Sequence, residues 1–452
     1  MSKTIEFFKE LSKIPRESGN EEKIADYIVE FAKSRNLEYL RDSYNNVIIK
    51  KYANDEKIII LGAHLDMVCE KNIDKEFDFK KDSIEVYEEN GYLKANGTTL
   101  GADNGIGVAV ILNILDSNYD VSIEAVFTTM EETTMEGAEK IDLSSLKGKK
   151  MINLDGFDAD TILIESASFT DIDIKMNYVM KEKINDLYKI TLSGLEGGHS
   201  GFDINKNRGN SIKILSELLL KISDIKISSL IGGTKINVIP SMAMALFSTN
   251  IKIDDIVKEF ELKKRVEFPK LVIKLEKVSL KNNSLNTIDS ERLLKSIINF
   301  KHGIFSVNNR NEVTTSENLS LVNLEKNLIQ VGLRSSNLEE RENVLEYLNN
   351  YCKEYDYNLI IKGYQPGFRT LEDCDLVKEL INSYQKIDGN KPNLKSVHIG
   401  VEVGLLKEKI NDLEVAIISP KILDAHSPNE RVEIESINKC DEWLNNFLSD
   451  YN

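Results

Sequence analysis

Acidic and histidine side chains recur directly after apolar runs at widely separated points of this 452-residue chain. His64 and Asp66 follow one such run. Glu131 and Glu132 follow a second run, and Asp155 follows a third. In an open α/β sheet, ligands bind beyond the carboxyl ends of the strands, which lie together where the strands are parallel. The pattern therefore predicts a largely parallel sheet that brings these side chains to one edge.

The spacing of apolar residues predicts that strands and helices alternate in the first part of the chain, which is typical of a parallel sheet flanked by helices. The strands expected here are 57–63, 124–129 and 150–154. The expected helices are 4–14, 21–37 and 105–115. Asn20 precedes the second helix and is predicted to cap it, because its side-chain oxygen can accept free amides of the first turn.

The middle of the chain is predicted to form an inserted α+β domain with an antiparallel sheet, because β-rich runs dominate there. These runs are 187–192, 243–253, 271–280, 328–333 and 359–362, with helices at 211–222 and 339–354. The first pattern returns with a helix at 376–387, a strand at 415–419 and a helix at 433–448. We therefore expect an α/β fold with a discontinuous catalytic domain (1–170 and 368–452) and an inserted lid domain (171–367), which is long enough for two lobes.

Charge and cysteine content argue against several classes of protein. With 58 basic and 74 acidic residues, the formal net charge is −16, which argues against binding nucleic acid or an anionic membrane. The N-terminus lacks the apolar core of a signal peptide, and no stretch has the roughly 18 apolar residues that span a bilayer. The four cysteines are widely spaced without a CxxC pair, so no disulfide framework is indicated and a cytoplasmic location is expected.

Five side chains have the types and positions of a two-metal site. They are His64, Asp103, Glu132, Asp155 and His426. Imidazole nitrogens and carboxylate oxygens suit zinc, manganese or cobalt. Two neighbouring cations need a shared carboxylate, and Asp103 is the best candidate because the glycines around it let the backbone approach closely. One ion would also take His64 and Asp155. The other would take Glu132 and His426.

Two further acidic residues could complete a catalytic site. A water that bridges two metal ions is acidified and can attack a carbonyl, but a base must still carry its proton to the leaving amine. Glu131 is adjacent to a predicted ligand and could be that base. Asp66 lies two residues after His64 and could accept the second imidazole N–H, which would orient the ring.

Each segment has a simpler explanation when it is taken alone. His64 and Asp66 could simply end a strand, and two adjacent glutamates are common in solvated loops. The Ser-Pro sequence after His426 is typical of a turn. Only the joint occurrence of these segments at one predicted sheet edge favours a metal centre.

Four longer segments extend the pattern, and they are 64–71, 97–107, 194–201 and 425–431. Their sequences are HLDMVCEK, GTTLGADNGIG, GLEGGHSG and AHSPNER. They resemble the bacterial aminoacyl-histidine dipeptidases, also called peptidase D, Xaa-His dipeptidase or bacterial carnosinase. These enzymes belong to a wider aminoacylase/carboxypeptidase group of co-catalytic zinc peptidases. The resemblance covers essentially the whole chain.

The resemblance implies a role for each residue of the predicted site. It implies two zinc ions, which are held by His64, Asp103, Glu132, Asp155 and His426. It also implies that Glu131 is the general base and that Asp66 is the orienting acid. The peptide bond between Asp103 and Asn104 is expected to be cis.

Substrate-binding residues are implied as well. His199 matches a histidine that reaches the scissile carbonyl, where a hydrogen-bond donor would stabilise the developing oxyanion. Asn237 and Arg334 match residues that bind substrate, and an Arg fork suits a carboxylate. Without the resemblance, a strand-end amide and a solvated charge would be the simpler explanations of Asn237 and Arg334.

The chain also departs from the family pattern. Segment 397–404 reads VHIGVEVG where the family usually has His-Ala-Gly-Leu-Glu-Cys-Gly, and Gly156 stands where a serine is usual. These changes affect the expected substrate preference. They leave His398 and Glu402 as candidates for the substrate pocket or for support of the metal ligands. His302 has no motif around it and is expected at the surface.

The sequence therefore predicts a cytoplasmic zinc-dependent dipeptidase, with Mn²⁺ or Co²⁺ as substitutes. It would cleave unblocked dipeptides of the Xaa-His or β-alanyl-histidine type by attack of a metal-bridging hydroxide. A tripeptidase or an N-acyl-amino-acid deacylase with the same metal centre is the alternative in the same class. The alternative of another class is a metal-dependent peptide-binding protein without turnover, and the presence of Glu131 argues against it. A small peptide is the expected partner, and a homodimer is left open.

Overall fold

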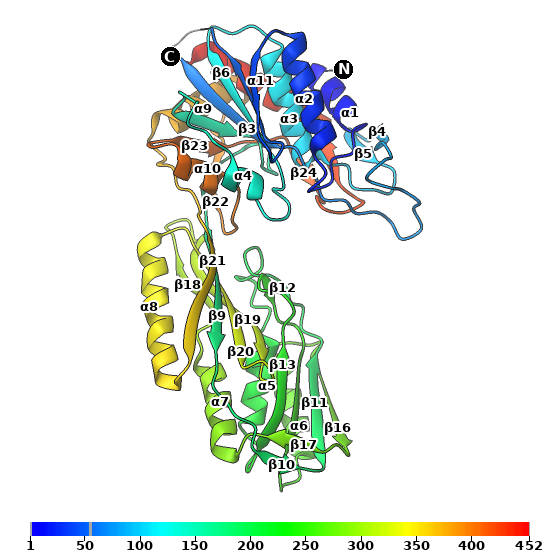
Figure 1. The fold of residues 1–452 in the computed structure, drawn as a ribbon, viewed down its shortest axis with the longest axis vertical. Coiled ribbons are helices and arrows are strands. Elements are labelled where there is room, and N and C mark those ends of the chain that lie inside the picture. The colour runs from blue at the N-terminus through cyan, green and yellow to red at the C-terminus, as the bar shows by residue number, and fades with distance from the viewer. Residues whose placement is uncertain (1, 54–56, 452) are drawn as a thin grey trace. The chain divides into compact units, whose positions relative to one another are not determined.

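The chain forms two compact units, each with its own apolar core (Figure 1). The computed structural model describes residues 2–53 and 57–451. Unit 1 consists of Met1–Ser166, Phe368–Val397 and Val401–Asn452. Unit 2 consists of Ala167–Gly367 and His398–Gly400. The boundary expected at residue 170 falls inside strand β9, which spans Ser168–Lys175.

Unit 1 is built on an eight-stranded mixed sheet in the order β1-β2-β6-β3-β7-β23-β8-β22. In that order the strands are β1 (Glu38–Arg41), β2 (Val47–Lys51), β6 (Ser122–Thr128), β3 (Ile58–His64), β7 (Lys150–Asn153), β23 (Glu414–Ile417), β8 (Thr161–Ser166) and β22 (Asn393–Val397). The pairs β6-β3, β3-β7, β7-β23 and β22-β8 are parallel. The remaining pairs, β1-β2, β2-β6 and β23-β8, are antiparallel. The predicted α/β class with a mostly parallel sheet is confirmed.

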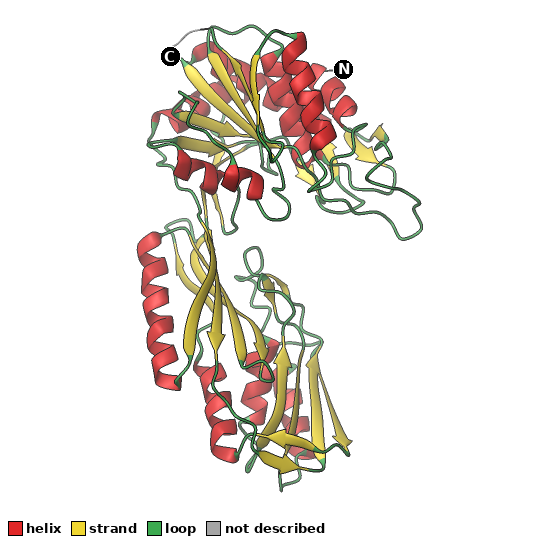
Figure 2. Ribbon diagram, in the orientation of Figure 1, coloured by secondary structure: helices red, strands yellow, loops and turns green. Residues whose placement is uncertain are grey.

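Burial on both faces explains why the central strands of unit 1 read as continuous apolar runs. All seven residues of β6 are buried, as are six of the seven in β3. Parallel strands that are covered on both faces have this composition. The helices that pack around the sheet (Figure 2) are α1 (Lys3–Leu11), α2 (Glu22–Ser34), α3 (Ala102–Leu115), α4 (Glu136–Lys140), α9 (Asp375–Asp388), α10 (Val403–Lys409) and α11 (Ile434–Asp450).

A small four-stranded sheet brings the end of unit 1 back to its first third. It runs in the order β24-β25-β5-β4. Its strands are β24 (Ile422–Leu423), β25 (Arg431–Glu433), β5 (Tyr92–Ala95) and β4 (Val86–Glu89). The segment that connects β24 to β25 carries His426, so the pairing of β25 with β5 carries this histidine toward residues that precede it by more than 300 positions.

Unit 2 contains a nine-stranded sheet in which all pairs are antiparallel. Its strands are β16 (Val272–Val278), β11 (Leu187–Ser193), β15 (Ala243–Ser248), β13 (Lys226–Gly232), β19 (Val313–Asn323), β20 (Leu328–Ser335), β9, β21 (Asn358–Gln365) and β18 (Gly303–Val307). Two short ribbons pair β10 (Glu182–Ile184) with β17 (Asn282–Ser284) and β12 (Gly198–His199) with β14 (Val238–Ile239). The predicted antiparallel α+β insertion is confirmed.

Alternate residues of the unit 2 strands face an apolar core. In β15, for example, every second residue is buried, which is the pattern of a sheet with one covered face. The helices that contribute to this core are α5 (Ser211–Leu219), α6 (Asp254–Lys264), α7 (Thr287–Asn299) and α8 (Leu338–Tyr355). Within 2–53 and 57–451, no helix combines the length and the apolar character needed to cross a membrane.

Four helices, α1, α5, α7 and α8, start with a side-chain cap, whereas the other helices of the described residues lack one. The side chain of Asn337 accepts the amides of Glu339 and Glu340 at the start of α8. The predicted cap of α2 by Asn20 is wrong, because α2 starts after Glu21 and has no side-chain cap. Glu21 instead accepts the amide of Met130 at 3.0 Å, which ties the start of α2 to the loop after β6.

Candidate metal centre

Neighbouring strand ends position the predicted ligands in unit 1. His64 is the last residue of β3, and Asp155 lies two residues after the end of β7. Glu131 and Glu132 follow the end of β6. Because β3 pairs in parallel with both β6 and β7, the three carboxyl ends are adjacent. Asp103, in the first turn of α3, lies beside these strand ends, next to His64.

Asp103 lies between the two histidines. Its Oδ1 is 3.1 Å from His64 Nε2, and its Oδ2 is 3.0 Å from His426 Nε2. His426 Nε2 also lies 3.0 Å from Glu132 Oε1. His64 Nε2 lies 3.6 Å from Asp155 Oδ1. One carboxylate that faces both imidazoles has the arrangement of a ligand shared by two cations.

Two overlapping groups of donor atoms could each hold a metal ion. His64, Glu131 and Asp155 form one group, in which the donor atoms lie within 4.8 Å of one another. His64, Asp103 and Glu132 form the other. His426 joins the second group through Asp103 and Glu132, and Glu131 enters the first although it was predicted as a base.

The cluster carries more negative charge than its histidines can neutralise. The side chains of Asp103, Glu132 and Asp155 are at most 10% exposed. Burial raises the pKa of Glu132 and of Asp155. Burial and the neighbouring Asp155 raise the pKa of Glu131 well above its usual value. Buried carboxylates are paired or coordinate metals, so the donor set fits divalent cations in charge as well as in ligand type.

The two histidines respond to this charge. Burial opposes protonation of His64, but hydrogen bonds with Asp103 and Asp155 raise its pKa well above the usual value. Hydrogen bonds with Asp103 and Glu132 raise the pKa of His426 to about 10. Surroundings that stabilise a proton this strongly also favour a bound metal cation.

Asp66 organises the loop that carries the two glutamates. It is fully buried, and its carboxylate accepts the backbone amides of Glu131 at 3.0 Å and Glu132 at 3.1 Å. Ser18 Oγ donates to the same carboxylate at 2.7 Å. Its Oδ1 lies 3.5 Å from His64 Nδ1. The carboxylate therefore binds the glutamate loop more closely than it binds the imidazole that it was predicted to orient.

Two residues that the sequence did not single out hold the backbone around this cluster. Glu430 accepts the amides of Leu100, Gly101 and Asp103. Arg16 donates to the carbonyl oxygens of Leu65, Asp66 and Gly101. Burial raises the pKa of Glu430 to about 7. Glu430 belongs to the quoted motif 425–431, so the sequence could have indicated its role. No motif surrounds Arg16, so nothing in the sequence indicated its role.

The backbone takes unusual conformations at and next to the predicted ligands. The peptide bond between Asp103 and Asn104 is cis, as predicted. Met130 and His426 have φ of 55° and 61°, a left-handed region that non-glycine residues rarely adopt. Ser427 Oγ donates to Asp424 O at 2.7 Å and thereby closes the turn that presents His426.

Glu402 lies in unit 1, directly before α10, and is fully buried. Thr128 Oγ1 donates to its carboxylate at 2.5 Å, and Asn153 Nδ2 donates at 3.4 Å. These two residues end β6 and β7. Burial raises the pKa of Glu402 to about 7. Its contacts favour support of the strand ends over contact with substrate.

The other four predicted substrate-binding residues lie in unit 2. His199 belongs to β12, and Ser200 N donates to Asn237 O at 2.8 Å. Arg334 Nε donates to Ser200 Oγ at 3.2 Å, which links β20 to the same loop. His398 Nε2 lies 2.7 Å from Ser316 Oγ on β19.

Arg334 is a buried cation without a carboxylate partner. It is 5% exposed, and its guanidinium carbon lies 4.6 Å from the centre of the Phe169 ring. No ion pair joins it to any acidic residue in the described part of the chain. Burial lowers its pKa to about 10. A buried guanidinium of this kind suits an anionic ligand.

His302 is partly buried inside unit 2 and not at its surface, so the prediction of a surface position is wrong. Its Nδ1 accepts the amide of Leu319 at 3.3 Å. Burial and the nearby Lys213 lower its pKa to about 4. It contributes to the packing of unit 2.

Comparison with known proteins decides the family. Residues 60–450 match the profile of peptidase family M20/M25/M40. The chain belongs to this family. It is 30% identical to the cytosol non-specific dipeptidase of Escherichia coli (strain K12) over 456 residues, which cover 96% of this chain and 94% of the relative.

Solved structures agree with this assignment. The aminoacylhistidine dipeptidase of Vibrio alginolyticus superposes with a TM-score of 0.88 at 29% identity, over 99% of this chain and 96% of that chain. The aminopeptidase PepT of Bacillus cereus ATCC 10987 shares the fold, with a TM-score of 0.57 at 15% identity over 99% and 97%. The chain is therefore an M20-family metallopeptidase, as predicted, and the donor groups of unit 1 are the candidates for its dinuclear metal site.

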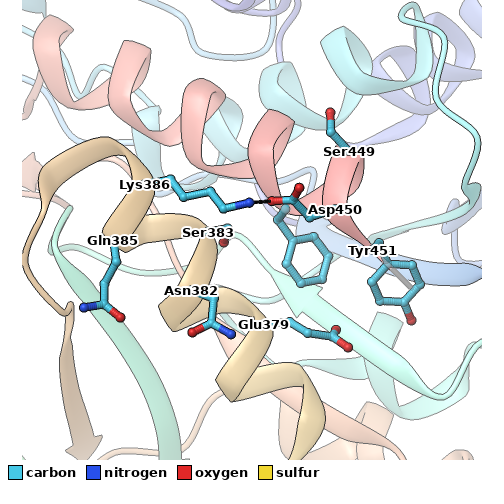
Figure 3. A pocket seen from close by; sticks show the side chains of 9 residues that line it. Glu379, Asn382, Ser383, Gln385, Lys386, Ser449, Asp450 and Tyr451 are labelled. Carbon is cyan, nitrogen blue, oxygen red and sulfur yellow. Dashed lines mark hydrogen bonds and ion pairs between the residues drawn. The ribbon is translucent and has the colours of Figure 1, made fainter.

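A separate hollow of about 690 Å³ lies between α9 and α11 of this peptidase (Figure 3). Glu379 and Tyr451 line it, and Lys386 forms an ion pair with Asp450 beside it. None of the predicted site residues is among its lining side chains. The hollow is thus distinct from the metal cluster.

Proposed function

We propose that this metallopeptidase is a dipeptidase that hydrolyses unblocked dipeptides, including Xaa-His and β-alanyl-histidine dipeptides. The position of Asp103 between His64 and His426, with Glu131 in the same cluster, carries the proposal. The names of two relatives that match over nearly the full chain support it, since both are dipeptidases. One is named for aminoacylhistidine substrates and the other as non-specific.

The metal site is assigned to the five ligands expected from the sequence. They are His64, Asp103, Glu132, Asp155 and His426. Two Zn²⁺ ions, with Mn²⁺ or Co²⁺ as substitutes, suit this mixture of imidazole and carboxylate. When bound, such ions polarise the substrate carbonyl and make a water more acidic.

Residues of the chain itself move the protons and hold the substrate. Glu131 accepts the proton of the attacking water and delivers it to the leaving amine nitrogen, for which a raised pKa is suited. Asp66 holds the backbone of Glu131 in place. Arg334 binds the substrate carboxylate, and His199 donates to the scissile carbonyl. Unit 2 is thus proposed as the substrate-holding lid.

A substrate panel tests the proposal. Purified enzyme loaded with Zn²⁺, Mn²⁺ or Co²⁺ is assayed with β-Ala-His, Gly-His and Ala-Ala, and with a tripeptide and an N-acetyl amino acid. We expect the free dipeptides to have the highest kcat/KM, and the ratio of Gly-His to Ala-Ala measures preference for histidine. Faster turnover of the tripeptide or the N-acetyl amino acid would replace the proposal by a tripeptidase or a deacylase.

Location and partners follow from the same comparison. The relative from Escherichia coli is named a cytosol enzyme, and we propose the cytoplasm for this chain as well. Its partner is a small peptide. Fractionation of cells that express the full chain tests the location, and recovery in a membrane pellet would contradict it.

A further inference from the structure

The imidazole of His199 is held in one tautomer by the backbone. Its Nδ1 accepts the amide of Gly201 at 3.1 Å and the amide of Phe202 at 3.3 Å. An N–H group can donate only to a nitrogen that carries a lone pair, so Nδ1 is unprotonated. In a neutral ring the single proton then lies on Nε2. His199 therefore offers Nε2 as a hydrogen-bond donor.

The surroundings also keep the ring neutral. Burial and the charge of Arg334 lower the pKa of His199 to about 4. A proton added at Nδ1 would point at the two backbone N–H groups that now donate to it. The ring packs against Phe202, with ring centres 5.2 Å apart, which limits its rotation.

Asp203 binds both backbone polar groups of His199. His199 N donates to Asp203 Oδ2 at 2.8 Å, and Asp203 N donates to His199 O at 2.9 Å. Gly198 precedes them with φ of 138°, and a Cβ at this position would lie 2.5 Å from Asp203 Oδ2. Only glycine leaves room for this carboxylate, so the turn is built around Asp203.

Arg208 closes the same turn from its other end. Its Nη2 donates to Asp203 Oδ1 at 2.9 Å, and its Nη1 donates to Gly197 O at 3.0 Å. Lys206 Nζ also reaches Asp203 Oδ1 at 2.9 Å, but this side chain is 56% exposed and bonds only Asp203 among the described residues. Arg208 thus joins the two sides of the loop, whereas Lys206 adds a solvated charge.

We propose that Asp203 and Arg208 are positioning residues that hold His199 as the neutral Nε2–H tautomer, with Nε2 as the donor to substrate. The role in turnover rests on the proposed function, but the tautomer rests on unit 2 alone. A neutral donor binds a carbonyl oxygen more strongly as negative charge develops on it. Loss of its alignment should therefore lower kcat more than it raises KM.

The tautomer is measured directly by NMR. Zn²⁺-loaded full-length enzyme with ¹⁵N-labelled histidine gives long-range ¹H–¹⁵N spectra, in which H199Q identifies the His199 signal. We expect a protonated Nε2 and a bare acceptor Nδ1 at neutral pH. In D203N and R208K the two nitrogen shifts should move toward the average of two tautomers. K206A should keep the wild-type pattern. A protonated Nδ1 in the wild-type protein would overturn the inference without affecting the proposed function.

Kinetics with a dipeptide completes the test. We expect D203N and R208K to lower kcat by about 10- to 100-fold, because small displacements of a catalytic donor are costly. H199Q should lose at least as much, and K206A should stay within about twofold of wild type. Metal content and melting temperature are measured on each variant. If D203N does not fold, the comparison of R208K with wild type decides the result. Unchanged shifts and unchanged kcat in the folded variants would refute the positioning roles.

Discussion

The histidines of the two units lie in opposite electrostatic surroundings. In unit 1, hydrogen bonds with carboxylates raise the pKa of His64 and His426. In unit 2, burial and the nearby Arg334 lower the pKa of His199 to about 4 and that of His398 to about 3. The charge of the neighbours, more than the residue type, therefore decides whether an imidazole sits in a cation site or remains a neutral donor.

The difference extends to the ligands that each unit suits. Unit 1 brings together more buried carboxylates than its nearby positive charges can neutralise. Unit 2, in contrast, buries Arg334 with no carboxylate partner among the described residues. A dipeptidase needs both, because metal cations activate the scissile bond and a cation must receive the free carboxylate of the substrate.

The largest effect is expected from the two adjacent glutamates of unit 1. E131Q should lower kcat by about 10²- to 10⁴-fold, because the proton carrier is lost, and should retain two metal ions per chain. E132Q should lose metal, because the change removes a proposed ligand of the ion that His426 also binds. Elemental analysis of the purified variants, together with kcat, separates the two roles. Loss of a metal ion in E131Q would instead make Glu131 a ligand, as its place beside His64 and Asp155 allows.

A smaller effect is expected in unit 2. R334M should raise KM about 10- to 100-fold for a free dipeptide, because a hydrogen bond to a charged group contributes about 1.5–3 kcal/mol. A dipeptide amide, which lacks the carboxylate, should be affected much less. R341M is the matched control, since Arg341 also stacks on a ring, that of Tyr364, but pairs with Glu342. Equal losses for both substrates would remove the carboxylate from the proposal.

The smallest effect concerns the pH dependence of stability in unit 2. The pKa of His302 is about 4 in the folded protein, whereas that of a histidine in an unfolded chain is about 6.5. The unfolded chain then binds more protons between these values, so the free energy of unfolding falls as pH is lowered from about 6.5 to 4. H302Q should weaken this dependence. Hydrogen exchange of peptides from β18 and β19 measures it, and an unchanged slope in H302Q would contradict it.

Local pattern was a good guide to which side chains gather at the strand ends of unit 1. His64, Glu132 and Asp155 were predicted to lie together because each belongs to or follows an apolar run, and such runs are visible in the sequence. The strand β19 was missed because it is rich in buried polar residues, among them Ser316 and Asn318. Their polar atoms bond partners such as His398 and the carbonyl of Val238, which no local pattern reveals.

The sequence by itself determined the alternating elements, the candidate metal-binding side chains and the family resemblance, because these depend on neighbouring residues and on short motifs. Only the tertiary structure decided which groups hold the candidate site residues in place. Arg16, Glu430 and Asp203 act through backbone amides and carbonyls, and every residue carries these groups. Their selection depends on which chain segments meet in space, as when Glu430 reaches Leu100 across 330 positions.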